Sequence, residues 1–454
     1  MKYFLAVDIG ASSGRHIVGW LDGGILKTEE VYRFNNAMLS HGGRLYWDTA
    51  RLFKEVVNGL KAAKERGFKP DYIGIDTWAV DYALLDKEDN IIGEVFAYRD
   101  ARTEKAADKL HRIICFDELY ERTGIQFQPF NTVYQLYADK LSGKLDGAES
   151  MLMLPDYLNF LLTGVKKQEY TNATSTGLVN ARTHNWDFGI TQKLGFCEKL
   201  FGGLTQPSAI VGGLKRALAE DIGYSATVIL PATHDTASAV LAAPQQGENP
   251  YISSGTWSLL GIVRPEASTG ENDRKANYSN EGSINGQFRY QKNIMGLWLI
   301  QSVRKELGNL SYSTLAQMAK CKQHCGLIDV NDKRFLSPKS MVAEINRALG
   351  RKLQPASIMR VIYDSLAYGY AQAVAELETN TGRTYGAINI FGGGSRDMLL
   401  NELTAQATGK KVVAGPVEAT AIGNLIMQMK GAGEIEDLSA TAQIIKNSFE
   451  VKEV

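Results

Sequence analysis

One carboxylate near the middle of the chain has the neighbours expected of a catalytic base. Asp235 lies between His234 and Thr236, after the apolar run 228–230 and before the small residues 237–240. The apolar run predicts the end of a strand and the small residues predict a helix, with Thr236 or Asp235 itself as the helix cap. Asp235 in this loop either faces a cleft as a general base or serves only as a cap.

Three loops rich in glycine and serine occur in the chain, at 8–15 (DIGASSGR), 253–256 (SSGT) and 392–395 (GGGS). The first two lie between apolar runs, which predicts strand–turn–strand units whose backbone N–H groups can bind an anion. The third ends a strand and leads into a helix capped by Ser395, and a helix amino terminus favours anions. Neither GxxxxGK[ST] nor GxGxxG is present in the first loop. Each loop alone could be a structural turn, but together they suit a triphosphate.

Two charged residues of the first loop extend this interpretation. Arg15 can neutralise phosphate charge, and Asp8 can hold Mg²⁺ through water, because Mg²⁺ keeps much of its hydration shell. In the second loop Thr256 offers a hydroxyl. The loops therefore predict a magnesium–nucleotide site, with donors from both halves of the chain.

The two halves share an order of elements that predicts two α/β domains. Each half opens with strand–turn–strand and continues with helices and strands, a weak internal duplication. We expect domains at 1–242 and 243–454, facing a central cleft. The elements expected with most definition are a hairpin turn at 22–24, helices at 49–66, 152–164 and 359–378, a strand within 72–86, mostly helical structure over 99–170, and strand–turn–strand over 251–263.

Composition excludes several classes of protein. The 454 residues carry 50 basic and 50 acidic side chains, so a nucleic-acid or membrane-surface partner is not expected. No signal peptide and no apolar run long enough to cross a bilayer are apparent, which predicts a cytoplasmic protein. Four cysteines make no disulfide framework, and we favour free thiols at Cys321 and Cys325 over a zinc site.

The motifs DIGASSGR, THDTASAV, SSGTWSLLG and FGGGSRDMLLNE resemble those of the FGGY carbohydrate kinases, in the actin-like ATPase superfamily. The likeness runs nearly end to end, through YRFNNAML, GIDTWAVDY, AYRDARTEK, GIQFQPFNTVYQL, LMLPDYLNFLLTG, EYTNATSTGLVN, KNIMGLWLIQ and GPVEATAIGN. Several of these are characteristic of members acting on L-rhamnulose and not on glycerol or xylulose. The resemblance implies two ribonuclease H-like domains with the active site between them, and transfer from Mg·ATP to the 1-hydroxyl of L-rhamnulose, as in L-rhamnose degradation. A monomer or small homo-oligomer is expected.

The resemblance also implies roles for single residues. Asp235 would be the catalytic base. The sugar would be held by Asp235 together with Ala79, His234, Thr236 and Asn293. The nucleotide would be held by Ala11, Ser12, Ser13, Gly14, Arg15, Thr256, Gln301 and Gly393. Two positions depart from the family pattern: Ala11 stands where many actin-like ATPases have Thr, and Ala79 stands where some relatives have Gly.

Two alternatives stay open at this point. The chain could be an FGGY kinase of another ketose, such as L-fuculose or L-xylulose. It could also be a nucleotide-switched binding protein, like actin, without a small substrate. Asp235 and the polar-aromatic stretch 124–136 favour a sugar site over the second alternative.

Overall fold

The computed structural model describes residues 1–244 and 249–454, which form two compact units. Unit 1 contains residues 1–242, 263–290 and 420–448, and unit 2 contains the rest of the described chain. The chain passes from unit 1 to unit 2 after Ala242, where the domain boundary was predicted. The predicted domains at 1–242 and 243–454 stay predictions. Two segments of the second range, 263–290 and 420–448, group with unit 1 by their contacts.

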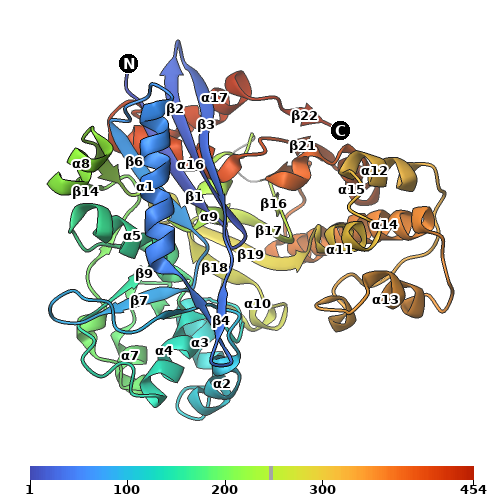
Figure 1. Ribbon diagram of the computed structural model, residues 1–454. Coiled ribbons are helices and arrows are strands. Elements are labelled where there is room, and N and C mark those ends of the chain that lie inside the picture. The colour runs from blue at the N-terminus through green and yellow to red at the C-terminus, as the bar shows by residue number, and fades with distance from the viewer. Residues whose placement is uncertain (245–248) are drawn as a thin grey trace. The chain divides into compact units, whose positions relative to one another are not determined.

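Unit 1 is built on a mixed six-stranded sheet of order β14-β15-β6-β1-β2-β3 (Figure 1). Strand β1 pairs in parallel with β6, and β6 pairs in parallel with β15, whereas β1, β2 and β3 form antiparallel hairpins. The predicted hairpin turn at 22–24 is therefore confirmed. The strands are β1 (Phe4–Ile9), β2 (Ser13–Asp22), β3 (Ile25–Asn35), β6 (Tyr72–Thr77), β14 (Ile210–Gly213) and β15 (Thr227–Ile229).

Helix α1 (Thr49–Glu65) confirms the prediction for 49–66 and contacts strands β2 and β3 of this sheet (Figure 1). It begins because the Asp48 side chain accepts a hydrogen bond from the Arg51 N–H at 2.9 Å. Its buried face carries Leu52, Val56 and Leu60 at helical spacing, which removes their side chains from water.

The rest of unit 1 is largely helical between the short strands, as predicted for 99–170. A cluster of buried apolar side chains forms the core of this helical part. The predicted helix at 152–164 is observed as α5, which ends at Gly164 in the left-handed conformation, but 150–153 forms a strand. The elements are β4 (Leu39–His41), β5 (Arg44–Trp47), β7 (Tyr82–Leu85), β8 (Val95–Phe96), α2 (Glu104–Leu110), α3 (Phe116–Thr123), α4 (Thr132–Leu141), β9 (Ser150–Met153), α5 (Leu154–Thr163), β10 (Gln168–Glu169), α6 (Tyr170–Thr174), β11 (Val179–Asn180), β12 (Asn185–Trp186), α7 (Phe188–Leu194), β13 (Leu204–Thr205), α8 (Arg216–Ile222), α9 (Asp235–Leu241), α10 (Glu271–Lys275), β18 (Ser279–Gly282), α16 (Ala419–Gly431) and α17 (Thr441–Ser448).

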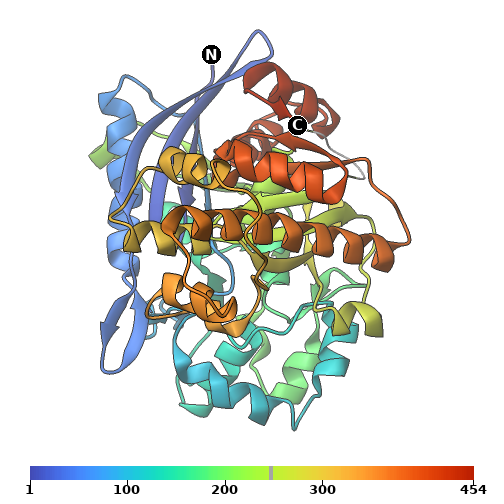
Figure 2. The same cartoon turned by 90° about the vertical axis from the view of Figure 1, so that its right-hand side faces the viewer.

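The second large sheet has the order β18-β19-β17-β16-β20-β21-β22. Strands β16, β20, β21 and β22 belong to unit 2, β18 belongs to unit 1, and β17 and β19 have residues in both. The predicted strand–turn–strand over 251–263 is confirmed as the antiparallel pair β16–β17. The predicted helix at 359–378 lies inside the 27-residue α14, which Figure 2 shows packed beside the shorter helices α12 and α15. The elements are β16 (Tyr251–Ser254), β17 (Trp257–Arg264), β19 (Phe288–Met295), α11 (Trp298–Glu306), α12 (Tyr312–Lys320), α13 (Met341–Ala348), α14 (Pro355–Thr381), β20 (Ala387–Phe391), α15 (Met398–Thr408), β21 (Lys411–Ala414) and β22 (Lys452–Glu453).

One predicted helix cap in unit 2 is wrong. Ser395 lies in a 3₁₀ turn, and its hydroxyl donates to the Gly392 carbonyl at 2.8 Å. Helix α15 starts two residues later, where the Asp397 side chain accepts from the Leu400 N–H at 3.2 Å. The turn separates the glycines from the helix, so they do not form its amino terminus.

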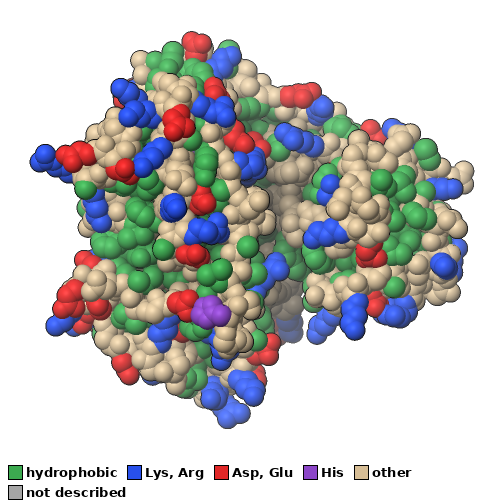
Figure 3. Space-filling model, viewed as in Figure 1, with side chains coloured by type: hydrophobic (Ala, Val, Ile, Leu, Met, Phe, Trp, Pro, Cys, Tyr) green, Lys and Arg blue, Asp and Glu red, His purple; other side chains and the backbone are tan. Residues whose placement is uncertain are grey.

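The cysteines have the free-thiol state that was predicted for Cys321 and Cys325. All four cysteines are free thiols. Basic and acidic side chains alternate over the face drawn in Figure 3, with no large patch of one sign. Among the helices of residues 1–244 and 249–454, none has the length and apolarity to span a bilayer.

Candidate active site

The carboxyl ends of three parallel strands of unit 1 bring three aspartates together. Asp8 on β1 is directly opposite Asp76 on β6. Beyond β15 the chain continues beside β6, because Thr77 forms a parallel bridge with His234. Asp235 follows at once. Ligands of open α/β sheets bind outside the carboxyl ends of strands, so this edge is the expected place for a site.

Asp76 was visible in the sequence but was given no role there. Its side chain is fully buried, the Asn424 amide donates to its Oδ2, and its Oδ1 has no hydrogen-bond partner. Burial, and then the nearby Asp8 carboxylate, raise the pKa of Asp76 well above its usual range. The sequences AVDIG and GIDTW are similar, since each is an apolar run that contains an aspartate. This similarity could have identified Asp76 as a partner of Asp8.

Asp8 is held by the residue that was predicted to contact phosphate. The Arg15 guanidinium donates to Asp8 Oδ2 through Nε at 2.8 Å and lies 2.7 Å away through Nη2. The pair is possible because the two residues are directly opposite in the β1–β2 hairpin. The Asp8 side chain is 6% exposed and that of Arg15 is 26% exposed, so the guanidinium is the part of the pair open to solvent.

Asp235 is the first residue of α9, and the helix cap is His234, which makes no side-chain cap bond. The predicted capping by Thr236 or Asp235 is thus wrong in position. The Asp235 Oδ1 instead accepts from the Thr236 N–H at 2.6 Å and from its hydroxyl at 3.1 Å. About a third of the Asp235 side chain (31%) meets solvent, yet the surrounding protein raises the pKa of its carboxyl, with Asp8 adding to the effect.

The loop before Asp235 is fixed by a buried glutamate that sequence reasoning missed. Glu169 Oε2 accepts from the Thr233 N–H at 3.2 Å and from the Thr233 hydroxyl at 2.7 Å. Its Oε1 accepts from the Thr171 N–H at 2.7 Å. On the other side, the Thr77 N–H donates to the Thr233 carbonyl at 3.0 Å. These bonds hold the backbone next to His234 in one position.

His234 itself contacts two buried charged side chains that the sequence did not single out. Its Nδ1 lies 2.9 Å from Arg289 Nη2 and 3.1 Å from Glu281 Oε2. Its Nε2 lies 3.5 Å from Asp235 Oδ1. The ring is thus held from behind and directed at the predicted base.

The first phosphate loop is a β-hairpin turn, as predicted, and no helix follows it. Gly10 N–H donates to the Ser13 carbonyl at 2.9 Å, and Asn36 braces the turn by bonds to Gly10 and Ser12. A Cβ on Gly14 would lie 2.2 Å from the Phe34 ring, so only glycine fits there. Ser12 is exposed, whereas Ala11 and Ser13 are partly buried. Phosphate binding by this loop stays a prediction.

Ala79 lies in the bend between β6 and β7, beside a strained residue. Val80 has φ of 70°, which is unfavourable for a β-branched side chain. The next residue, Asp81, is buried and accepts bonds from the indoles of Trp47 at 2.6 Å and Trp78 at 2.9 Å. Burial raises the pKa of Asp81 to about 6. The bend is therefore held firmly from the protein side, while Ala79 is partly exposed.

Two of the predicted nucleotide residues of unit 2 are in contact: Thr256 lies on the turn between β16 and β17, and Gln301 lies on helix α11. The Thr256 hydroxyl donates to Gln301 Oε1 at 3.1 Å. The turn passes close to the backbone at Gly296, where a Cβ would lie 2.6 Å from the Gly255 carbonyl oxygen. The glycine loop lies against the same turn: a Cβ on Gly394 would be 1.9 Å from the Ser254 hydroxyl.

Two further predicted residues of unit 2 have simple surroundings. Gly393 is exposed, at the tip of the glycine loop. Asn293 is partly buried on β19. Neither residue's predicted ligand contact is tested by these positions.

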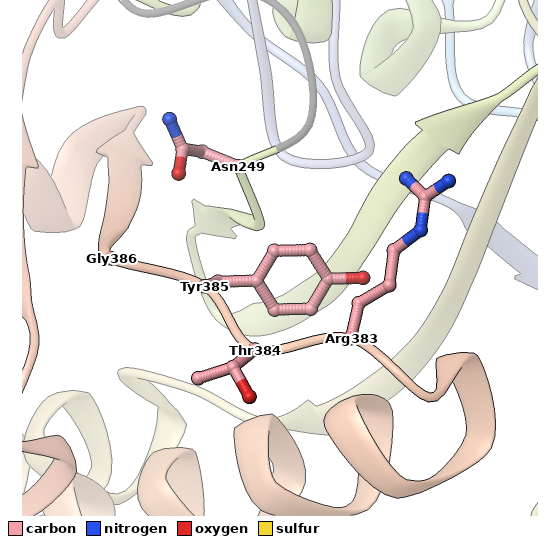
Figure 4. A pocket seen from close by; sticks show the side chains of 5 residues that line it. All are labelled: Asn249, Arg383, Thr384, Tyr385 and Gly386. Atoms are coloured by element: carbon pink, nitrogen blue, oxygen red, sulfur yellow. The ribbon is translucent and has the colours of Figure 1, made fainter.

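A separate hollow in unit 2 contains none of the predicted residues. It encloses about 470 Å³ and is lined by Asn249, Arg383, Thr384, Tyr385 and Gly386 (Figure 4). These residues precede β20, whereas the glycine loop follows that strand. The hollow is thus at the opposite end of β20 from the candidate nucleotide residues.

Within residues 1–244 and 249–454, no three His, Cys, Asp or Glu side chains gather as a complete metal site. That observation also leaves Cys321 and Cys325 without partners for zinc among the described residues. A metal that takes only one or two protein carboxylates does not need such a set.

Family models match almost the whole chain. The model described as the FGGY family of carbohydrate kinases, N-terminal domain, matches residues 3–242, and that of the C-terminal domain matches residues 250–432. The chain belongs to the FGGY family of carbohydrate kinases. It is accordingly an ATP-dependent sugar kinase, as the sequence predicted, and not a nucleotide switch without a small substrate.

Curated relatives extend over the same length. A rhamnulokinase of Oceanobacillus iheyensis is 45% identical, covering 98% of this chain and 97% of the relative. A rhamnulokinase of Halalkalibacterium halodurans is 46% identical, covering 100% and 98%. One of Bacillus subtilis is 41% identical, covering 99% and 94%.

Solved structures confirm the predicted two-domain, actin-like fold. A xylulose kinase from Lactobacillus acidophilus superposes with a TM-score of 0.82 at 16% identity, covering 100% of this chain and 93% of that one. A glycerol kinase from Plasmodium falciparum gives 0.77 at 16% identity, covering 99% and 94%. Identities this low support the shared fold and leave the substrate open.

Proposed function

We propose that this FGGY kinase transfers the γ-phosphoryl group of Mg·ATP to the 1-hydroxyl of L-rhamnulose, in the cytoplasm, with Asp235 as the base. The proposal on the substrate is supported above all by the rhamnulokinases that are 39–46% identical over nearly the full length of both chains. No observation favours L-fuculose or L-xylulose as the better substrate.

Asp235 suits the role of base by its chemistry and place. Phosphoryl transfer goes through a loose transition state, so the attacking hydroxyl needs orientation and a proton acceptor more than strong activation. The Asp235 carboxylate is reachable from solvent, and its Oδ1 is held by Thr236. A raised pKa makes it a better proton acceptor than an ordinary aspartate. In-line transfer would place the hydroxyl between this carboxylate and the γ-phosphate.

The acidic edge of unit 1 fits a magnesium ion carried with the nucleotide. Mg²⁺ takes one or two carboxylates and fills its remaining positions with water and phosphate oxygens. Asp8 would hold it through water, and the buried Asp76 Oδ1, which lacks a partner, offers a second acceptor for that water. Bound there, the ion would neutralise phosphate charge.

The nucleotide contacts follow the same reasoning. Backbone N–H groups of the turn 11–15 would face the phosphates, and Arg15 would add positive charge. Thr256, Gln301 and Gly393 would complete the nucleotide site from unit 2. Ala79, His234, Thr236 and Asn293 would hold the sugar.

Initial rates of ADP release across a panel of acceptors test the substrate. The panel contains L-rhamnulose, L-fuculose, L-xylulose, D-xylulose, glycerol and D-gluconate, each with ATP and Mg²⁺. We expect the highest kcat/KM with L-rhamnulose and a product phosphorylated at carbon 1, located by phosphorus–carbon coupling in NMR spectra. Related ketoses should still react, though more slowly than L-rhamnulose, because a site discriminates only weakly against an added methyl or hydroxyl group.

Equal or better kcat/KM on glycerol or D-gluconate would overturn the assignment. A preference for L-fuculose or L-xylulose would keep the kinase and change its substrate. The control is the same assay without Mg²⁺ in a buffer that contains EDTA, and removal of the ion should abolish turnover.

A further inference from the structure

A buried cluster behind His234 is not explained by any role assigned above. Arg289 has a fully buried side chain, and its Nη2 lies 2.9 Å from His234 Nδ1 and 3.0 Å from Glu281 Oε2. Its Nε donates to the Gly282 carbonyl at 3.2 Å, while its Nη1 has no hydrogen-bond partner. Burying a charged arginine costs free energy unless its charge is paired and its donors are hydrogen-bonded.

The donors around Nδ1 decide which ring nitrogen of His234 carries the proton. A guanidinium can only donate, and Nη2 has two hydrogens with two acceptors within reach, His234 Nδ1 and Glu281 Oε2. If Nδ1 carried the proton, it could donate to Glu281 Oε2, 3.1 Å away, but one hydrogen of Nη2 would then face an N–H. Arg289 would then have a second unsatisfied donor besides Nη1, which burial makes costly.

The opposite tautomer satisfies every donor of Nη2. A proton on Nε2 lets Nδ1 accept from Arg289 and turns an N–H toward Asp235 Oδ1, 3.5 Å away. Glu281 balances the arginine charge through its contact with Nη2 at 3.0 Å.

We propose that Arg289 and Glu281 are positioning residues that hold His234 as the neutral Nε2–H tautomer. His234 is then a fixed hydrogen-bond donor to the sugar oxygen beside Asp235; this last step rests on the proposed function. A neutral donor orients the sugar without forming an ion pair with Asp235, so the carboxylate keeps its ability to accept the hydroxyl proton.

The tautomer is measured directly on the whole protein labelled with ¹⁵N-histidine. Two-bond proton–nitrogen correlations distinguish a protonated from an unprotonated ring nitrogen, and the His234→Gln variant assigns the signal among the six histidines. We expect Nε2 protonated and Nδ1 unprotonated at pH 7. An Nδ1–H tautomer or an imidazolium at that pH would overturn the proposal.

Arg289→Met gives the sharper test. It leaves the Glu281 carboxylate as the remaining acceptor beside Nδ1, so the proton should move to Nδ1. We then expect the KM for the sugar to rise at least about tenfold with the KM for ATP within about twofold. Arg274→Met, which removes a partly exposed arginine paired with Asp117, is the matched control and should change neither KM.

The outcomes separate this proposal from the proposed function. If Arg289→Met keeps the Nε2–H tautomer, or raises both KM values equally, the positioning role is wrong. If that variant does not fold, Arg289→Gln and the wild-type spectrum still decide, because the tautomer needs no substrate. If another ketose is the substrate, the KM comparison is made with that ketose and the tautomer prediction is unchanged.

Discussion

Replacing Asp235 by asparagine separates a catalytic carboxylate from a structural one. Asparagine keeps the volume and an oxygen that can accept from the Thr236 N–H, now 2.6 Å from Oδ1. It cannot take a proton from the sugar hydroxyl. Loss of a general base costs about 10²–10⁴-fold in rate, or roughly 3–5 kcal/mol of barrier. We therefore expect kcat to fall at least about 100-fold.

Folding should hardly respond to the same change. The helix α9 is capped at His234 and not by the Asp235 side chain, and the bond to Thr236 survives in asparagine. The carboxylate also has a raised pKa, so removing its charge relieves burial and does not cost stability. The free energy of unfolding should stay within a few tenths of a kcal/mol of wild type.

The assay is ADP release at saturating sugar and ATP, with urea unfolding run on the same samples. Asp48→Asn is the matched control, because Asp48 caps α1 through the Arg51 N–H and lies outside the candidate site. It should keep full kcat. More than about a tenth of wild-type kcat in Asp235→Asn would refute the catalytic role, since a loss below tenfold is smaller than general-base removal produces.

Three further changes have defined outcomes. Gly394→Ala places a Cβ 1.9 Å from the Ser254 hydroxyl, so the glycine loop must shift. We expect a loss of about 1–3 kcal/mol of stability and a KM for ATP raised about tenfold. Gly386→Ala is the control and should change neither, because a Cβ at Gly386 has no atom within 4 Å. Glu169→Gln sets an amide against the donors of Thr233, which should cost roughly 1–3 kcal/mol in urea unfolding and lower kcat; an unchanged kcat would contradict the anchoring of that loop. Asp81 has its pKa raised from 3.8 to about 6, so the native state holds its proton where the unfolded chain has released it, and stability should fall by roughly 3 kcal/mol as pH rises through that window. Asp81→Asn should flatten this slope between pH 4 and 6, and an unchanged slope would rule out Asp81 as its source.

Local patterns in the sequence predicted most of the elements that carry the candidate site. The hairpin at Asp8–Arg15 followed from two apolar runs around a glycine turn, and the register places these two residues opposite each other. The strand–turn–strand at 251–263 followed from the same pattern. Such elements depend on neighbours in the chain, so spacing alone is enough to predict them.

Pairings between distant segments could not be predicted in this way. Asp76 meets Asp8 only because β6 enters the sheet beside β1, and the parallel pairing is a property of the fold. Glu281 and Arg289 reach His234 from a segment about fifty residues away, with no motif to mark them. The Ser395 cap failed for a different reason: Ser395 lies in a 3₁₀ turn, and the helix is capped two residues later by Asp397.

The return of 420–448 to unit 1 has a consequence for synthesis of the chain on the ribosome. Helix α16 lies against helix α9 so closely that a Cβ on Gly423 would be 1.8 Å from the Ser238 carbonyl oxygen, and Asn424 donates to Asp76. Gln428 donates to the Leu5 carbonyl at 3.0 Å. Until the segment 420–448 has been synthesised, the nascent chain therefore lacks part of its acidic edge, and that surface stays uncovered.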